Sequence, residues 1–211
     1  EYRNDLLENM GAKSYLEYYK KNLFLITGSG MLMFTSLNNI KNNKFDFTFI
    51  DTNLKSVIGE DYISSELNII KHFLILDNKI YISYLNKIND NCYYNSILVA
   101  NFDLKEMNFQ NFFSMNECQN IPSLSAGGRL SKFKDKHILY TIGDYDSSEQ
   151  YMDMPQKLDS LLGKVIKINT LNKEYKIISI GHRNPQGLFY DDVNDVAGES
   201  RGERLGVSLD V

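Results

Sequence analysis

The sequence predicts an all-β protein built as part of a β-propeller. Three observations lead to this fold class. Short β-rich segments follow one another without a long helix between them, turn-forming residues separate them, and the pattern repeats at intervals of about 50 residues. Strands joined by short turns pair antiparallel. Repeats of about four strands are typical of propeller blades, which cover both faces of each sheet by stacking radially.

The repeat is clearest between residues 77–84 and residues 135–142. Each segment places a polar turn before a strand that mixes aliphatic and aromatic residues, and Tyr81 aligns with Tyr140. A single sheet of this kind cannot bury both of its faces, so the repeat favours radial stacking over an isolated sheet.

The repeat gives about three and a half four-stranded antiparallel blades within residues 22–211, whereas a closed ring needs about four to eight. A partial ring exposes sheet edges, which invite pairing. The sequence therefore leaves open whether further blades lie elsewhere in the gene or whether another chain completes the propeller. The expected blades are at residues 23–58, 62–119 and 123–180, with the start of a further blade at 187–211.

Residues 1–21 are predicted to form a short helical segment. Apolar residues such as Leu6, Met10 and Tyr15 fall near helical spacing. A helix packed on the rim of a larger domain and a partner-binding helix both fit this pattern.

Composition and charge narrow the function classes. The chain has 211 residues, 43% of them hydrophobic and 24% charged, with a net charge of −4, as in an ordinary globular protein. Basic residues are scattered, so no nucleic-acid-binding face is expected. No run of about 18 apolar residues predicts a membrane span. The dispersed histidines predict no metal site. The N-terminus shows no signal peptide and no initiator Met, as in a mature or trimmed chain.

Two glycine-containing segments carry the candidate chemistry. Glycine lets the backbone turn sharply and approach a ligand, and Pro185 fixes a bend. Arg183 and Asn184 can therefore present a guanidinium and a carboxamide to a planar, anionic partner. The segments comprise the motifs GGRL at 127–130, YTIGD at 140–144, SLLGKVIKI at 160–168 and GHRNPQGL at 181–188.

In this order and spacing, the four motifs resemble the glucose/sorbosone dehydrogenase family over about residues 62–192. The resemblance implies a six-bladed propeller and a sugar (aldose) dehydrogenase that uses pyrroloquinoline quinone (PQQ) and calcium. It implies that Arg183 and Asn184 contact the quinone, whose carboxylates suit an arginine. It also implies a sugar or another small polar ligand, with hydride passing from the sugar to the quinone.

Two departures from the family pattern bear on activity. The family has a catalytic His four residues before the Arg of GGRL, where this chain has Ser125. A serine hydroxyl is no base near neutral pH, and a positioned general base contributes about 10²–10⁴ in rate. The Glu-x-Gly-Pro loop that holds calcium in the family is not found in residues 196–203. Two functions stay open: a quinone-dependent sugar dehydrogenase, and a non-catalytic propeller that binds a ligand or a protein.

The two cysteines are predicted to form a disulfide. Cys92 and Cys118 lie in polar segments, where a buried free thiol is not expected, and the family resemblance implies a cysteine pair in this region. A bridge would place the protein in an oxidising compartment, such as the bacterial periplasm, or outside the cell. The alternative is two free thiols in a cytosolic protein.

Overall fold

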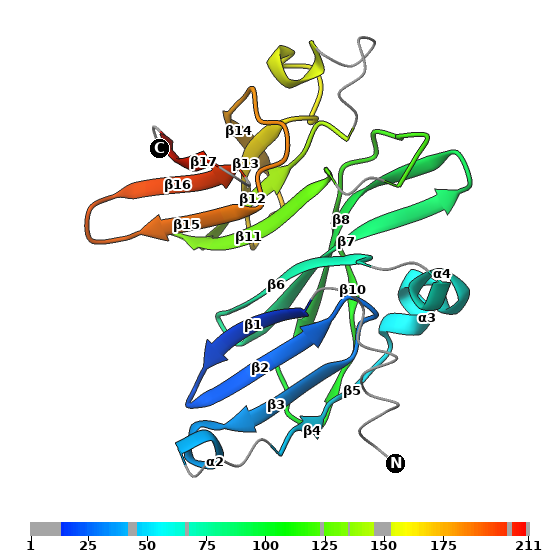
Figure 1. Cartoon of the computed structure of the whole chain (residues 1–211), viewed down its shortest axis with the longest axis vertical. Helices are drawn as coiled ribbons and strands as arrows, with labels where there is room; N and C mark the ends of the chain where they lie inside the picture. The colour runs from blue at the N-terminus through cyan, green and yellow to red at the C-terminus, as the bar shows by residue number, and fades with distance from the viewer. Residues whose placement is uncertain are drawn as a thin grey trace. The chain divides into compact units, whose positions relative to one another are not determined.

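The chain folds mostly into antiparallel β-sheets, as the sequence predicts (Figure 1). The structure, a computed structural model, divides into two compact units. The first unit comprises residues 1–82 with 98–111, and the second comprises residues 83–97 with 112–211. The structure describes residues 14–41, 46–65, 68–122, 125–134, 136–145, 153–201 and 204–209.

The first sheet belongs to the first unit. Its strands are β1 (Ser14–Tyr19), β2 (Asn22–Thr27), β3 (Leu32–Ser36) and β4 (Thr48–Phe49), in that order. The turn from β2 to β3 contains Gly30, whose φ of +84° is left-handed. A Cβ at Gly30 would also lie 2.7 Å from Cδ1 of Ile63, so glycine fits this turn best.

The helix predicted over residues 1–21 is wrong where the structure describes this segment, because Ser14–Tyr19 form β1. Exposure alternates from residue to residue along β1, which is the period of a strand. Lys20 and Lys21 have φ values of 45° and 65°, as the central residues of a tight hairpin turn do. Pairing with β2 therefore outweighs the helical spacing of the apolar residues. Residues 1–13 lie outside the described part of the chain.

The described residues of the first unit also form three short helices and a small parallel pair of strands. No helix in the described ranges is long and apolar enough to cross a membrane. The buried residues Leu54, Ile58 and Ile63 anchor two of these helices. The elements are α2 (Leu37–Lys41), α3 (Leu54–Ile58), α4 (Glu60–Ser65), β5 (Asp51–Thr52) and β9 (Glu106–Met107), and β5 pairs with β9.

The second sheet contains β6 (Ile70–Leu76), β7 (Lys79–Asn89), β8 (Cys92–Asn101) and β10 (Gln110–Ser114). Its order is β10-β8-β7-β6. Asp77 and Asn78 form the turn between β6 and β7, with φ values of 50° and 57°. Positive φ at both central residues is typical of a two-residue hairpin, and short polar side chains tolerate it.

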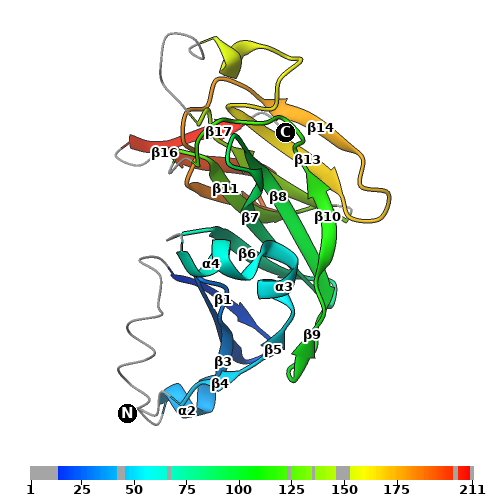
Figure 2. The same ribbon diagram turned by 90° about the vertical axis from the view of Figure 1, so that its right-hand side faces the viewer.

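The third and fourth sheets lie in the second unit. The third contains β11 (Gly127–Phe133), β12 (His137–Ile142), β13 (Lys164–Asn169) and β14 (Tyr175–Ser179) in that order, so β14 is an edge strand (Figure 2). A 3₁₀ turn, η2 (Met154–Gln156), precedes β13. The fourth sheet contains β15 (Gly187–Asp191), β16 (Val196–Arg201) and β17 (Arg204–Leu209).

Four-stranded antiparallel sheets of this kind are the blades of a partial β-propeller. The expected blade limits 62–119 and 123–180 enclose the strands of the second and third sheets. The first sheet begins at Ser14, ahead of the expected residue 23, because β1 is a strand.

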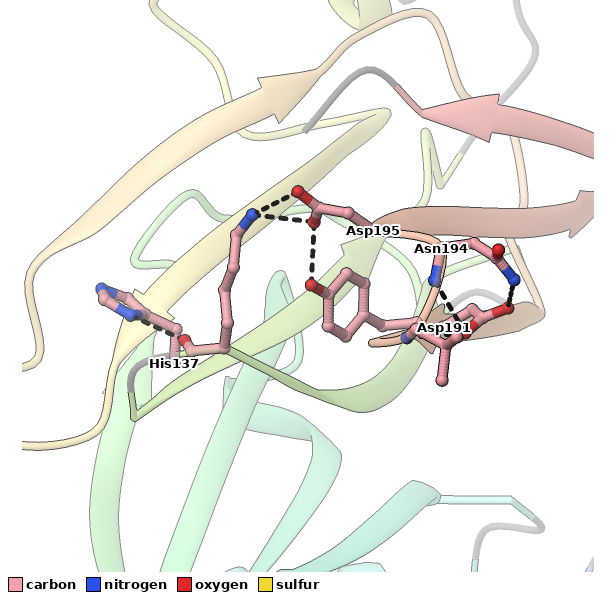
Figure 3. A network of polar contacts seen from close by, with 7 residues as sticks. His137, Asp191, Asn194 and Asp195 are labelled. Atoms are coloured by element: carbon pink, nitrogen blue, oxygen red, sulfur yellow. Dashed lines mark hydrogen bonds and ion pairs between the residues drawn. The ribbon is translucent and has the colours of Figure 1, made fainter.

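The third and fourth sheets share an apolar core and a polar clamp. Phe133, Leu139, Val165 and Ala197 form one buried cluster, against which residues of β14 and β15 pack. On the β15–β16 turn, the carboxylate of Asp195 accepts hydrogen bonds from Lys134 and Tyr190, as Figure 3 shows. A second ion pair joins Lys132 to Asp192 at 3.2 Å.

The predicted disulfide is confirmed. Cys92, at the start of β8, is bonded to Cys118, and their Cα atoms are 4.7 Å apart. Next to it, Tyr93 and Gln119 exchange two backbone hydrogen bonds of 2.8 Å. The segment that follows β10 is therefore fixed to β8 by covalent and hydrogen bonds.

Candidate functional site

The two glycine-containing segments meet at one end of the third sheet, within the second unit. The N–H of Gly143 donates to the carbonyl of Ala126 (2.8 Å), and the N–H of Gly163 donates to that of Gly143 (3.0 Å). The N–H of His182 donates in turn to the carbonyl of Gly163 (3.0 Å). This row of hydrogen bonds continues the sheet beyond its strands and holds the loops of the four motifs in place. We call it the glycine ladder.

Glycine is required in this ladder because the backbones approach too closely for a side chain. A Cβ at Gly143 would lie 1.7 Å from the carbonyl oxygen of Ser125. A Cβ at Gly163 would lie 2.4 Å from the carbonyl oxygen of His182, and the φ of Gly163 is +65°. The segment that carries Ser125 is therefore held directly against the end of β12.

Thr141 links the two segments from inside the sheet. Its buried hydroxyl accepts the N–H of Arg129 (2.9 Å) and donates to the carbonyl of Pro185 (2.9 Å). Together, these two hydrogen bonds connect the GGRL strand to the loop that carries Arg183. The sequence motifs do not predict this role, although a threonine inside an otherwise apolar buried strand is a usable signal.

Arg183 is oriented by Asp144. The Nε of Arg183 lies 3.3 Å from Oδ2 of Asp144, and the N–H of Asp144 donates to the carbonyl of Arg183 (2.7 Å). The Asp144 side chain is 7% exposed, whereas that of Arg183 is 63% exposed. The carboxylate is thus buried beneath the guanidinium. The described residues make no hydrogen bond to the terminal nitrogens of Arg183, and the side chain is mostly exposed, so these donors are available to a ligand.

Asn184 offers the complementary group. Its Oδ1 is buried and has no hydrogen-bond partner among the described residues. A buried acceptor without a partner is rare in folded proteins, because it loses its hydrogen bond to water. A ligand that brings a donor to this oxygen would remove that cost. Consecutive residues of this loop therefore provide exposed donors, at Arg183, and a buried acceptor without a partner, at Asn184.

No imidazole joins these groups in the described part of the chain. His182 is buried, and its Nε2 lies 2.7 Å from Oγ of Ser179, so it anchors the loop. His137 contacts the carbonyl of Lys134 at 3.2 Å in the β11–β12 turn. His72 belongs to the first unit and packs edge-on against Tyr15.

The described ranges hold no group of three or more His, Cys, Asp or Glu side chains placed to bind an ion. The side chains of Arg183, Asn184 and Asp144 offer hydrogen bonding and ion pairing.

Comparison with known proteins identifies the class. The family model for glucose/sorbosone dehydrogenase matches residues 75–208, more than half of the chain. The chain therefore belongs to the glucose/sorbosone dehydrogenase family, and the resemblance predicted from the four motifs is confirmed. No curated protein sequence matches the chain.

Solved structures agree on the fold. A glucose dehydrogenase matches with a TM-score of 0.67 at 13% identity, over 92% of this chain and 58% of that one. The soluble aldose sugar dehydrogenase of Escherichia coli, solved in its apo form, matches with a TM-score of 0.65 at 14% identity, over 90% and 57%. A glucose dehydrogenase-type putative oxidoreductase of Thermus thermophilus matches with a TM-score of 0.62 at 15% identity, over 91% and 58%. The chain thus spans somewhat more than half the length of these structures.

Proposed function

We propose that this chain provides the quinone-binding part of a sugar dehydrogenase-like propeller, and that it binds PQQ without oxidising sugar by itself. The observation that carries the proposal is the Asp144–Arg183 pair beside Asn184. The guanidinium of Arg183 is held by the buried carboxylate of Asp144, and its terminal nitrogens have no partner among the described residues. The next residue, Asn184, has a buried acceptor without a donor.

These groups fit the quinone that the family implies. The terminal nitrogens of Arg183 would hold a carboxylate of the quinone, since guanidinium and carboxylate match in charge and in planar geometry. Oδ1 of Asn184 would accept the pyrrole N–H of the same molecule. When bound, the quinone supplies the hydride acceptor. The residues of the chain contribute binding and orientation.

The missing function is proton removal from the sugar hydroxyl. Ser125 occupies the position of the family's base, and its hydroxyl does not accept a proton near neutral pH. Asp144 is already paired with Arg183, so it does not replace that base. Without a positioned base, the rate loses a factor of about 10²–10⁴.

The disulfide supports a location in the periplasm or outside the cell, because such bonds persist in oxidising compartments. A sugar or another small polar ligand would reach the quinone from the open side of Arg183. Further blades, from another region of the protein or from a partner chain, would complete the ring.

Titration with PQQ, with and without calcium, tests the proposal through the change in quinone absorbance. We expect saturable binding at micromolar PQQ and an affinity at least about tenfold lower in Arg183→Ala, which removes a charge-assisted hydrogen bond. Lys157→Ala, which removes an exposed cation elsewhere in the unit, is the matched control and should bind as the wild type does. Absence of saturable binding, or equal affinities for Arg183→Ala and Lys157→Ala, would overturn the proposal.

A further inference from the structure

The second unit has a cleft of about 510 Å³ that lies apart from the glycine ladder. It is bounded by the edge strand β14, by the loop that precedes β13 and by the segment that follows β10. Its volume lies within the range of small-molecule sites, roughly 300–1,000 Å³. None of Arg183, Asn184 and Ser125 lines it.

The walls of the cleft are fixed in place. The carboxylate of Glu117 accepts hydrogen bonds from the hydroxyl of Ser160 (2.7 Å) and from the N–H of Leu161 (2.9 Å). Glu117 directly precedes Cys118 of the disulfide, so a covalent bond holds one wall and its carboxylate holds the other. A site built in this way loses little conformational entropy when a ligand binds.

Tyr175 provides a flat aromatic surface in this cleft. It is 51% exposed, although its ring packs edge-on against buried Phe113, with 5.6 Å between ring centroids and an angle of 80°. This contact orients the ring. Leu158, which is 73% exposed, adds apolar surface to the same cleft. An exposed, oriented aromatic ring offers its negative face to the C–H groups of a ligand.

The polar groups of the cleft suit a ligand with hydroxyl groups and no negative charge. The side chain of Asp159 is exposed and makes no ion pair or hydrogen bond with the described residues, so its carboxylate can accept hydrogen bonds from a ligand. Glu117 adds a second carboxylate, which is already bonded to Ser160 and Leu161. Two carboxylates disfavour an anionic ligand. A ligand that matches the aromatic ring and the acceptor has hydroxyl groups on its edge and an apolar face, as a pyranose ring has.

A peptide added to the edge of β14 is the competing occupant, because edge strands accept further strands. Lys176 lies within β14, and a lysine on an edge strand opposes such pairing. The exposed charge therefore favours a small ligand that lies on the ring of Tyr175 over a strand that pairs with the backbone.

We propose that this cleft binds a neutral saccharide, with one pyranose face on Tyr175 and hydroxyl groups bonded to Asp159. This binding site is separate from the quinone site and does not depend on it.

Titration of ¹⁵N-labelled protein with methyl β-D-glucopyranoside and with maltose, without quinone, tests the proposal. The methyl glycoside has no free hydroxyl at C1, so its binding reports recognition and not oxidation. We expect saturable shifts of the amide signals of residues 158–161 and 175–177, with a millimolar dissociation constant.

Variants identify the groups responsible. Tyr175→Ala and Asp159→Asn should each weaken binding by about tenfold or more, whereas Tyr175→Phe keeps the ring and should bind nearly as well as the wild type. Leu171→Ala, an exposed apolar residue outside the cleft, is the surface control. Absence of saturable shifts at about 50 mM saccharide, equal binding by Tyr175→Ala and the wild type, or shifts at these residues with an extended hexapeptide alone would overturn the proposal.

Discussion

Gly143 is the residue on which the backbone of the site depends most directly. A Cβ at this position would lie 1.7 Å from the carbonyl oxygen of Ser125, so Gly143→Ala must displace one of the two segments. We expect a loss of about 3 kcal/mol in the free energy of unfolding, since overpacking against backbone is costly. Urea denaturation at constant m-value measures this loss.

Ser125→Ala is the matched variant, because it keeps the carbonyl that Gly143 contacts and removes only a hydroxyl. Its expected cost is about 1 kcal/mol or less. If Gly143→Ala proved as stable as Ser125→Ala, the close approach in the glycine ladder would be wrong.

Lys164 links stability to pH. Its side chain is fully buried, and its ammonium donates to the carbonyls of Met154 (3.0 Å), Pro155 (2.9 Å) and Leu162 (2.6 Å). Burial lowers the pKa of Lys164 from its usual 10.5, although the charges of Glu117 and Asp159 oppose this effect. Between the lowered pKa and 10.5, the unfolded chain binds more protons than the folded one, so stability rises with pH.

Lys164→Met removes the titrating ammonium group and leaves the three carbonyls without a donor. We expect it to be less stable than the wild type by about 3 kcal/mol at neutral pH. We also expect the difference in unfolding free energy to grow as the pH rises toward 10.5. Chemical denaturation at a series of pH values from neutral upward provides the measurement, and a difference that stays constant or shrinks would contradict the assignment.

The sequence identified some residues of the site and missed others for a physical reason. Arg183 and Asn184 stand out in the sequence because their types and their glycine- and proline-bounded loop indicate ligand contact, and that contact stays a prediction. The roles of Thr141 and Gly143 were not predictable, because they arise from contacts with segments distant in the sequence. Asp144 lay between these cases: its pairing with Arg183 is a simple charge match, but its burial appears only in the fold.

At the scale of elements, the β15–β16 hairpin is attached to the third sheet by ion pairs. The ammonium of Lys134 and the hydroxyl of Tyr190 lower the pKa of Asp195 from its usual 3.8. The stabilisation is therefore complete above about pH 3.8 and is lost as the pH falls through the lowered value.

Asp195→Asn removes the charge of this clamp and nearly preserves its shape. We expect faster amide hydrogen exchange in β15 and β16, and a weaker dependence of that exchange on salt than in the wild type, since salt screens exposed ion pairs. Asp192→Asn, which affects the neighbouring pair with Lys132, should produce a smaller change. Unchanged exchange in Asp195→Asn would show that the apolar core alone holds the hairpin.

The sequence located most strands because aliphatic and aromatic runs between turn residues have a clear period. It assigned Ser14–Tyr19 wrongly, since tyrosine and leucine at positions 15, 16 and 19 also fit a helix. Pairing with β2 makes this segment a strand. Such pairing depends on a second strand beyond a two-residue turn, so the spacing of apolar residues within the segment does not predict it.

At the scale of the whole molecule, the disulfide should contribute strongly to stability. Cys92 and Cys118 are 26 residues apart in the sequence. Closing a loop of that length stabilises the fold by about 3–4 kcal/mol in the chain-entropy account. The double variant Cys92→Ser/Cys118→Ser should lose about this amount in urea denaturation. An equally stable double variant would show that the hydrogen bonds of Tyr93 and Gln119 suffice.

The repeat predicted the number of strands per blade but not the number of blades in the complete ring. The chain spans 57% to 58% of the structures compared with it, so its own periodicity cannot show how the ring is completed. Likewise, the motifs predicted a family, while only the geometry shows a carboxylate committed to Arg183 and an acceptor on Asn184 left without a donor.

The most direct test of this account is the absorption spectrum of PQQ bound to the protein, recorded before and after addition of D-glucose. We predict that the quinone binds saturably through Arg183 and that its spectrum stays that of the oxidised form, because no base at position 125 removes the sugar proton. Failure to bind, or reduction of the bound quinone at a rate proportional to protein concentration, would contradict the account.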